Sequence, residues 1–188
     1  MIECPIDESN GVWIGNDIAH YYDQSLSQSI CDYLISKKIK TVYEFGCGNG
    51  LYSKKMLEHG LDVDSSDGNP DTPELTQGLS YTLDISKKLN LPKRDAVVCL
   101  EVGEHIPEKF ENTVITNLCY SSNNIIVLSW AIEGQGGHGH FNCRNNDYII
   151  NKMYVNNFLF DEKTSHQLRK TSDAWFRKTL MIFEKIVK

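Results

Sequence analysis

Two continuous apolar runs, at 95–101 and 124–130, restrict the fold of this chain more than any other feature of its sequence. Apolar residues that do not alternate with polar ones are typical of strands covered on both faces of a sheet. Neighbouring parallel strands need a long crossover, which is usually a helix, and the stretch 109–119 between the two runs is a plausible one. The pair of runs therefore predicts an α/β fold.

Shorter segments extend this alternation of strand and helix. Further strands are predicted at 40–45, 61–67, 81–84, 158–160 and 179–183. Further helices are predicted at 17–38, 51–59 and 162–171. Asp17 or Ser25 could cap the first of these helices, and Gly60 is expected just after the end of the second. The alternation predicts a doubly wound sheet of about seven strands with helices on both faces.

Composition excludes several classes of protein. The 188 residues suit one domain, and 19 Lys and Arg against 25 Asp and Glu argue against a broad phosphate-binding surface. The six cysteines form no Cys-x-x-Cys pair, and Cys99 and Cys119 lie in apolar segments, as expected in a reducing compartment. There is no signal-peptide pattern and no apolar run of about 20 residues. We therefore expect a cytoplasmic protein without a membrane partner.

A glycine-rich turn, Glu44-Phe45-Gly46-Cys47-Gly48-Asn49-Gly50, lies between the strand at 40–45 and the helix at 51–59. Its glycines allow a tight turn and a close approach of a ligand to the backbone. The spacing G-x-G-x-G differs from the dinucleotide fingerprint G-x-G-x-x-G. An acid two residues before the first glycine would repel a pyrophosphate, but it suits the cationic amino-acid end of S-adenosylmethionine (SAM).

The turn resembles the first motif, E/D-x-G-x-G-x-G, of class I SAM-dependent methyltransferases, and the resemblance extends over roughly 30–130. It implies a Rossmann-like fold with an antiparallel last strand, SAM as the cofactor and S-adenosylhomocysteine (SAH) as its product. Within a single domain at 1–188, the part at 39–188 would be the SAM-binding core and 1–38 a helical lid or substrate segment. The resemblance implies these cofactor-binding residues: Glu44, Gly46, Cys47, Gly48, Gly50, Asp67, Gly68, Asn69, Asp84 and Glu101. In the family, an acid in the position of Asp67 holds the ribose hydroxyls and one in the position of Asp84 reads the adenine amino group.

An acidic–histidine cluster follows the strand at 95–101. The carboxyl ends of strands face the ligand crevice in an open α/β sheet, so this cluster should line the site. If 101–105 form a helical turn, Glu101 lies on one face with Glu104 and His105. Two carboxylates and an imidazole make a credible half-site for a divalent metal. Alternatively, Glu101 holds the amino group of SAM and His105 packs against a helix.

A second histidine pair lies in a glycine-rich loop after the strand at 124–130. In an extended conformation, His138 and His140 would point to the same side of this loop. His105, His138 and His140 are the candidates for a catalytic base. His20, Trp13 and Tyr21 are candidates for the acceptor pocket, as are Arg144 and Tyr148. Each of these also has a purely structural explanation in packing or surface exposure.

The E-x-x-E-H pattern is similar to that of two metal-dependent methyltransferase groups. One acts on catechols in ubiquinone synthesis and the other on the 3′-terminal ribose of small RNAs, and both use a vicinal-diol acceptor. The resemblance implies Mg²⁺ or Mn²⁺ at Glu101, Glu104, His105, His138 and His140. The metal would lower the pKa of one hydroxyl, a histidine would take its proton, and the oxygen would attack the SAM methyl group. The same pattern also occurs in class I enzymes that hold no metal.

These observations together favour a SAM-dependent O-methyltransferase that acts on a sugar, a glycan or another vicinal diol. The alternatives are a metal-independent N-methyltransferase for a small molecule or a protein, and a 2′-O-methyltransferase for RNA 3′-ends. A scaffold that binds SAM for a partner enzyme is the non-enzymatic alternative. A Rossmann dehydrogenase would need a different glycine spacing. We expect a small acceptor or a glycan terminus, and a nucleic acid only as an RNA end.

Overall fold

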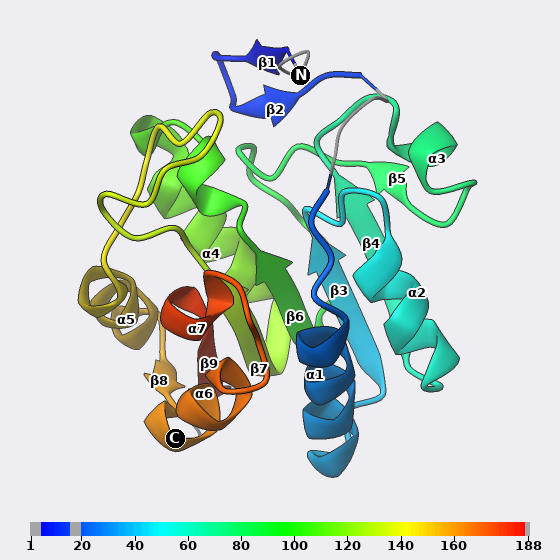
Figure 1. Cartoon of the computed structure of the whole chain (residues 1–188), viewed down its shortest axis with the longest axis vertical. Coiled ribbons are helices and arrows are strands. Elements are labelled where there is room, and N and C mark those ends of the chain that lie inside the picture. Colours follow the sequence, from blue (N-terminus) through cyan, green and yellow to red (C-terminus); the bar gives the residue numbers. More distant parts are fainter. Residues whose placement is uncertain (1–4, 16–19, 187–188) are drawn as a thin grey trace.

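A seven-stranded sheet forms the centre of the molecule (Figure 1), and the computed structural model describes residues 5–15 and 20–186. The strand order is β5-β4-β3-β6-β7-β9-β8. These strands are β3 (Thr41–Phe45), β4 (Asp62–Asp67), β5 (Tyr81–Thr82), β6 (Arg94–Leu100), β7 (Ser122–Ser129), β8 (Phe158–Phe160) and β9 (Met181–Lys185). Only β9 runs antiparallel to its neighbours, β7 and β8. The predicted mostly parallel, Rossmann-like sheet with an antiparallel last strand is confirmed.

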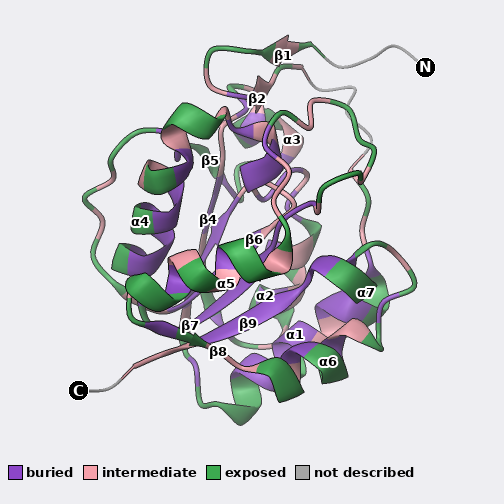
Figure 2. Cartoon of the chain, turned by 90° about the vertical axis from the view of Figure 1, so that its left-hand side faces the viewer, coloured by how far each residue is buried: buried purple, intermediate pink, exposed green. Residues whose placement is uncertain are grey.

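Helices cover both faces of this sheet (Figure 2). They are α1 (Gln24–Ser36), α2 (Leu51–Glu58), α3 (Thr72–Leu75), α4 (Glu111–Ser121), α5 (Asn146–Val155), α6 (Glu162–Arg169) and α7 (Phe176–Thr179). Successive residues of β6 enter opposite cores: Val97 packs with α4 and α5, whereas Val98 packs with α1, α2 and α6. Because side chains alternate across a strand, an apolar run can serve both cores at once.

The first helix begins later than its sequence predicts. It starts at Gln24, and the carboxylate of Asp23 accepts a hydrogen bond from the Leu26 N–H at 2.9 Å. Ser25 lies inside the helix, so it is not the cap, and Asp17 lies outside the described residues. The described residues between 20 and 22 are not helical. His20 and Tyr21 among them line a cavity. Gly60 follows α2 in a left-handed conformation (φ 81°), as expected.

An N-terminal hairpin, absent from the sequence-based prediction, covers the carboxyl ends of the parallel strands (Figure 1). It consists of β1 (Ile6–Asp7) and β2 (Val12–Trp13), which pair antiparallel. Its turn contacts two separate loops of the core: Asn10 donates to the Asp84 carboxylate at 3.2 Å, and Gly11 lies against the His105 carbonyl. The part of 1–38 that covers the site is therefore a hairpin, not a helix. Among the helices of the described chain, none is long and apolar enough to cross a membrane.

Candidate active site

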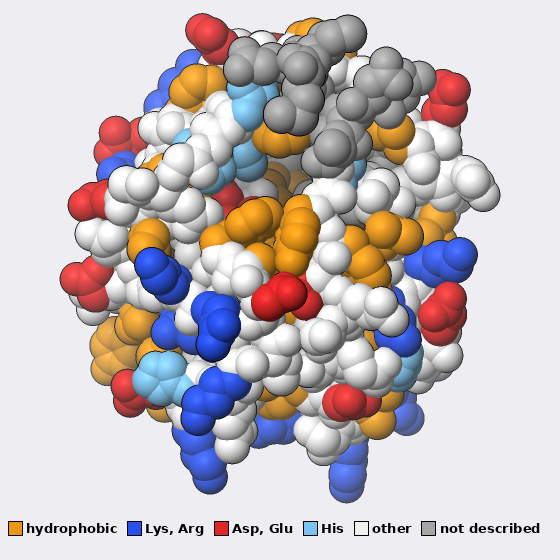
Figure 3. Space-filling view, in the orientation of Figure 1, with side chains coloured by type: hydrophobic (Ala, Val, Ile, Leu, Met, Phe, Trp, Pro, Cys, Tyr) orange, Lys and Arg blue, Asp and Glu red, His pale blue; other side chains and the backbone are white. Residues whose placement is uncertain are grey.

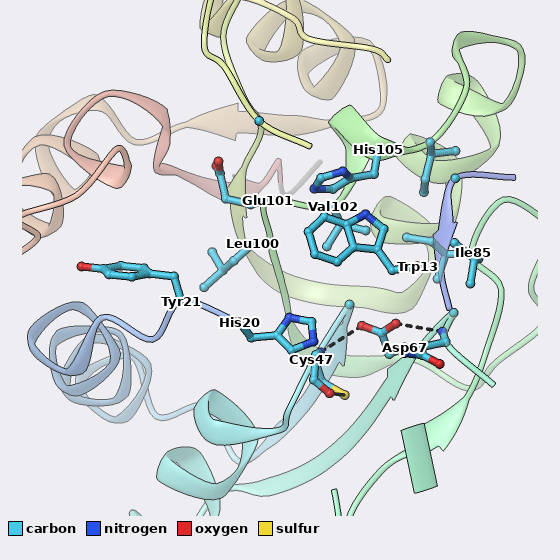
Figure 4. A pocket seen from close by; sticks show the side chains of 18 of the residues that line it. Trp13, His20, Tyr21, Cys47, Asp67, Ile85, Leu100, Glu101, Val102 and His105 are labelled. Atoms are coloured by element: carbon cyan, nitrogen blue, oxygen red, sulfur yellow. Dashed lines mark hydrogen bonds between the residues drawn. The ribbon is translucent and has the colours of Figure 1, made fainter. Parts of the chain in front are cut away.

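A cavity of about 420 Å³ lies at the carboxyl edge of the sheet beneath the hairpin. Residues from the glycine-rich turn, the ends of β4 and β6, the loop after β7 and the hairpin line it (Figure 4). Histidine side chains gather at one rim of this hollow in the space-filling view (Figure 3). None of the described residues that line it is a lysine or an arginine. The cavity therefore combines acids with imidazoles and apolar groups.

The glycine-rich turn forms one wall of the cavity. Gly46, Gly48 and Gly50 all have positive φ angles, between 54° and 78°. A Cβ atom at Gly46 would lie 2.1 Å from the Val102 side chain, so this position has no room for another residue. Cys47 is buried and burial raises the pKa of its thiol, which makes it a packing group and not a nucleophile. Residues 46–49 of the turn line the cavity, so their backbone lies at its wall.

Glu44, at the end of β3, is fully buried beneath this turn. Burial raises the pKa of its carboxyl group to about 8, although the Ser53 hydroxyl donates to it. A cation in the cavity would favour the ionised carboxylate and lower that pKa again. The position therefore suits the positively charged end of a ligand.

Asp67 connects the end of β4 to the glycine-rich turn. Its two carboxylate oxygens accept the N–H groups of Gly48 and Asn69, each at 2.9 Å (Figure 4). Asn69 in turn donates to the Gly15 carbonyl at 2.8 Å, and Gly68 packs beneath Val12 of the hairpin. Residues 67–69 thus contact both the turn and the hairpin, and they line the cavity.

Asp84 lines the same side of the cavity. Besides Asn10, it accepts the Ser86 N–H at 2.9 Å and pairs with Lys87 at 3.3 Å. Burial alone would raise the pKa of this carboxyl, but the hydrogen bonds from Ser86 and Asn10 hold it below its usual range. Asp84 is therefore an ionised hydrogen-bond acceptor that also anchors the hairpin.

Glu101 does not begin a helical turn with Glu104 and His105, contrary to the sequence-based expectation. It has a left-handed backbone (φ 53°), and a 3₁₀ helix starts only at Gly103. Its carboxylate accepts from the Gln135 amide at 2.9 Å and from the Thr179 hydroxyl at 3.1 Å. A left-handed conformation costs energy for a residue with a Cβ atom. Here these contacts and the bond from its own N–H to Ser129 hold it in place.

Glu104 is completely buried, and neither of its carboxyl oxygens has a hydrogen-bond partner among the described residues. Burial, with the nearby Glu101 carboxylate, raises the pKa of Glu104 well above its usual value. Its backbone carbonyl accepts the N–H groups of Phe141 and Asn142, both at 2.9 Å. The Glu104 backbone therefore holds the loop at 134–142, which carries His138 and His140.

The three predicted histidines come together around the indole of Trp13. The ring centroid of Trp13 lies 5.0 Å from that of His105 and 5.8 Å from that of His138, and the rings of His105 and His140 are 5.0 Å apart. Burial lowers the pKa of His105 to about 4, and His140 adds to this effect. His105 is therefore a neutral imidazole at physiological pH.

Backbone carbonyls orient two of these rings. The Nδ1 atom of His105 lies 3.1 Å from the Gly139 carbonyl, and that of His140 lies 3.1 Å from the Gln135 carbonyl. Since a carbonyl only accepts, each Nδ1 carries a proton. In the neutral ring of His105, the Nε2 atom therefore keeps its lone pair. A hydrogen bond from one ring nitrogen to a backbone carbonyl is the kind of contact that orients metal-binding histidines in proteins.

Three of the five predicted metal ligands form a group that fits a divalent ion. The nearest ligand atoms of Glu104, His105 and His140 all lie within 4.8 Å of one another. The unpartnered oxygens of Glu104 and the ring nitrogens of the two histidines are ligand types that such an ion binds. Two imidazoles and one carboxylate suit a transition ion such as Mn²⁺ better than Mg²⁺. Glu101 and His138 are not members of this group.

Two other sequence-based candidates are part of a structural network instead. Arg144 pairs with Glu108 and with the buried Glu111, and the Tyr148 hydroxyl donates to Glu111 at 2.6 Å. Neither Arg144 nor Tyr148 lines the cavity. Their polar groups already have partners within the fold, so their place in this structure gives no support to the expectation that they bind an acceptor.

Several residues that line or organise the cavity had no part in the sequence-based prediction. Gln135 and Thr179 hold Glu101, while Asn10 and Gly11 seat the hairpin. One signal for the hairpin was present in the sequence, because an Asn-Gly pair is typical of tight hairpin turns. No comparable signal marks Gln135 or Thr179, since their partner is distant in the chain.

Comparison with known proteins shows similarity only at the level of structure. No family model and no curated protein sequence matches the chain. One similar structure is the magnesium protoporphyrin IX methyltransferase ChlM from Synechocystis PCC 6803 with bound SAH, with a TM-score of 0.66 and 17% identity over 93% of this chain and 90% of that one. The sugar N-methyltransferase KedS8 from Streptoalloteichus sp ATCC 53650 has a TM-score of 0.71 and 9% identity over 92% and 96%. The N-methyltransferase NodS from Bradyrhizobium japonicum WM9, with SAH, has a TM-score of 0.65 and 15% identity over 85% of each chain. The chain thus has the fold of class I SAM-dependent methyltransferases.

Proposed function

We propose that this protein is a SAM-dependent methyltransferase that transfers the methyl group to a hydroxyl of a small vicinal-diol acceptor such as a sugar. The observation that carries the proposal is that one cavity contains two chemically different halves. The glycine-rich turn and Asp67 form the cofactor half, and the histidines around Trp13 form the acceptor half. Methyl transfer needs this adjacency, because donor and acceptor atoms must meet in line.

In the cofactor half, each polar group has a counterpart on SAM. Asp67 would accept the ribose hydroxyls and Asp84 the adenine amino group, and both are already oriented by backbone N–H groups. The buried Glu44 and the partly buried Glu101 would balance the positive charge of the methionine end. SAM carries the methyl group on a cationic sulfonium sulfur. When the methyl group is transferred, this sulfur becomes the neutral thioether of SAH.

In the acceptor half, the groups suit a neutral, hydroxyl-rich molecule. A hydroxyl needs a base to accept its proton, and His105 is unprotonated at neutral pH. The face of Trp13 offers an apolar platform for a sugar ring. The absence of lysine and arginine from the described lining disfavours a polyphosphate or nucleic-acid strand.

A divalent ion at Glu104, His105 and His140 is an alternative means of activating the hydroxyl in this proposal. With the ion bound, the free nitrogen of His105 would be a ligand and His105 would not be the base. Such an ion would lower the pKa of a hydroxyl bound to it. If such an ion activates the hydroxyl, treatment with EDTA should remove activity, and Mn²⁺ should restore it more effectively than Mg²⁺. Full activity in excess EDTA would reject the metal while leaving the methyltransferase proposal intact.

A second candidate is methylation of a sugar amine. The structural similarity to KedS8, a sugar N-methyltransferase, favours it. A neutral amine attacks without a base, so this reaction would depend little on the histidines. Comparison of matched hydroxy and amino sugars would decide between the two acceptors.

The decisive experiment is a methyl-transfer screen with labelled SAM against diol sugars, amino sugars, catechols and RNA 3′-ends, each with and without added metal. We expect label in diol sugars. Label only in amino sugars, catechols or RNA would replace the proposed acceptor class. Tight SAM binding without transfer to any acceptor would favour a scaffold, and binding of NAD without SAM would reject the proposal.

A further inference from the structure

If SAM occupies the cavity, its amino-acid end brings a carboxylate into a lining that is rich in acids. Glu44, Asp67, Asp84 and Glu101 all line the cavity, and none of its described lining residues is a lysine or an arginine. An anion placed there needs a hydrogen-bond donor to offset its loss of water. Imidazoles are the only side chains of the described lining that could also carry a positive charge.

His20 is the imidazole that lies in the cofactor half. A Cβ atom added to Gly48 would lie only 2.7 Å from its Nδ1 atom, so the ring packs directly on the glycine-rich turn. Its ring is nearly parallel to that of Trp13, at 23° and with centroids 6.2 Å apart. The close-up shows His20 below Trp13, near Asp67 and Cys47 (Figure 4).

One side of this ring lacks a partner. The Nε2 atom of His20 is buried and has no hydrogen-bond partner among the described residues. A buried polar atom without a partner costs free energy, so a ligand group in that position would be favoured. Burial lowers the pKa of His20 while the Asp67 charge opposes this. An incoming anion would favour the charged ring as well as the hydrogen bond.

The other histidines are placed differently. His105 and His140 direct their Nδ1 protons to the carbonyls of the loop after β7, and His105 lies on the opposite side of Trp13 from His20 (Figure 4). His138 contacts Trp13 edge-on at 5.8 Å. These three belong to the acceptor half, which leaves His20 to serve the cofactor half.

We propose that His20 binds the α-carboxylate of SAM through Nε2. This inference rests on the proposed function and adds a positioning residue to it. With its ribose at Asp67 and its cationic groups near Glu44 and Glu101, SAM would bring its carboxylate toward Gly48, against which the His20 ring packs.

The test compares SAM with decarboxylated SAM, which lacks only this carboxylate. Dissociation constants are measured by calorimetry for the unaltered protein, for His20→Ala and for His20→Gln. His166→Ala, an exposed histidine of α6 outside the cavity, is the matched control. Thermal melting followed by circular dichroism reports whether each variant folds.

We expect the unaltered protein to bind SAM at least about tenfold more tightly than decarboxylated SAM, because a hydrogen bond to a charged group is worth that much. His20→Ala should bind SAM more weakly and decarboxylated SAM as tightly as before, so that the preference for SAM is lost. His20→Gln should keep part of this preference, and His166→Ala should keep all of it. If His20→Ala lowered the affinity for SAM and for decarboxylated SAM by the same factor, the proposal would be overturned and His20 would be a packing residue. Equal affinity of the unaltered protein for both ligands would also overturn it, whereas no binding of either ligand would refute the proposed function itself.

Discussion

At the scale of the residue, His105 combines features that a proton acceptor needs. Its Nδ1–H is held by the Gly139 carbonyl, its Nε2 lone pair is available, and burial keeps its pKa at about 4. A base of this kind is ready at neutral pH without first losing a proton. Its basicity is weak, however, because burial disfavours the charged ring.

We therefore predict that His105→Ala lowers kcat by about 10²- to 10⁴-fold, the usual contribution of a general base. The dissociation constant of SAM should stay within about twofold, because His105 lies on the acceptor side of Trp13. Steady-state kinetics and calorimetry measure the two quantities, with His166→Ala as the control. Retention of more than a tenth of kcat would show that another group takes the proton.

The pH profile gives a separate prediction for the same residue. An unperturbed histidine base would lose half its activity near pH 6.5 on acidification. With a pKa of about 4, His105 should leave kcat/KM flat from about pH 5 to 7. Initial rates across this range test it, and a half-maximal rate near pH 6.5 would assign the base to a different histidine.

Some of these residues could be predicted from the sequence and others could not. Glu44, Gly46 and Asp67 lie at fixed distances from predicted strands, so the order of strands places them together. The position of His20 over Gly48 depends on how the chain before α1 crosses the sheet, which no local pattern encodes. The left-handed backbone of Glu101 also depends on distant partners, Gln135 and Thr179.

At the scale of the element, the β1–β2 hairpin fits closely over the turn at His105. Gly11 has a φ angle of 82°, and a Cβ atom there would lie 2.0 Å from the His105 carbonyl oxygen. Gly15 also has a positive φ, at 112°, but a Cβ atom there meets nothing within 4 Å. Substitution of Gly11 would bring both a steric clash and a backbone penalty, whereas substitution of Gly15 would bring only a backbone penalty. Comparing the two therefore isolates the effect of the clash.

We predict that Gly11→Ala displaces the hairpin and lowers kcat/KM for the acceptor by at least about tenfold, because small misplacements of a positioning element have large catalytic effects. Gly15→Ala carries a similar backbone penalty of about 1 kcal/mol and should lower kcat/KM much less. Kinetics on both variants, with melting temperatures, provide the comparison. Equal losses in the two would mean that backbone strain, not hairpin contact, is responsible.

Elements that bury continuous apolar residues were predictable, whereas short or polar ones were not. The strands β6 and β7 followed directly from their composition. Each strand of the hairpin has only two residues, which is too short for a pattern. Helix α5 buries only Ile149 and Met153 among many polar residues, so its amphipathic signal is weak. Both elements are stabilised by contacts with the rest of the fold.

At the scale of the whole molecule, buried acids make stability depend on pH. Glu44 has a pKa of about 8 when folded and 4.5 otherwise, so the folded state binds more protons between these values and stability falls as pH rises. His105 has the opposite effect, because its pKa falls from 6.5 to about 4 and stability rises with pH over that interval. Above pH 6.5 only the acids contribute.

The ligand-free protein should therefore lose roughly 1 to 2 kcal/mol of unfolding free energy between pH 6.5 and 8 through Glu44. Glu44→Gln removes the ionisation and should flatten this part of the curve. Urea unfolding at several pH values measures it, with Glu58→Gln, an exposed residue of α2, as the control. An unchanged slope in Glu44→Gln would exclude Glu44 as its source.

The position of β9 has a consequence for how the molecule is made. β9 pairs with β7 on one side and β8 on the other, and Met181, Ile182 and Phe183 are completely buried. During synthesis, β8 leaves the ribosome before the strand that must separate it from β7. The exposed edge of β7 therefore stays open, and β8 stays unpaired, until residues 181–185 have emerged. A nascent chain can assemble β3 to β7 early, but this edge closes only when the C-terminal strand is inserted.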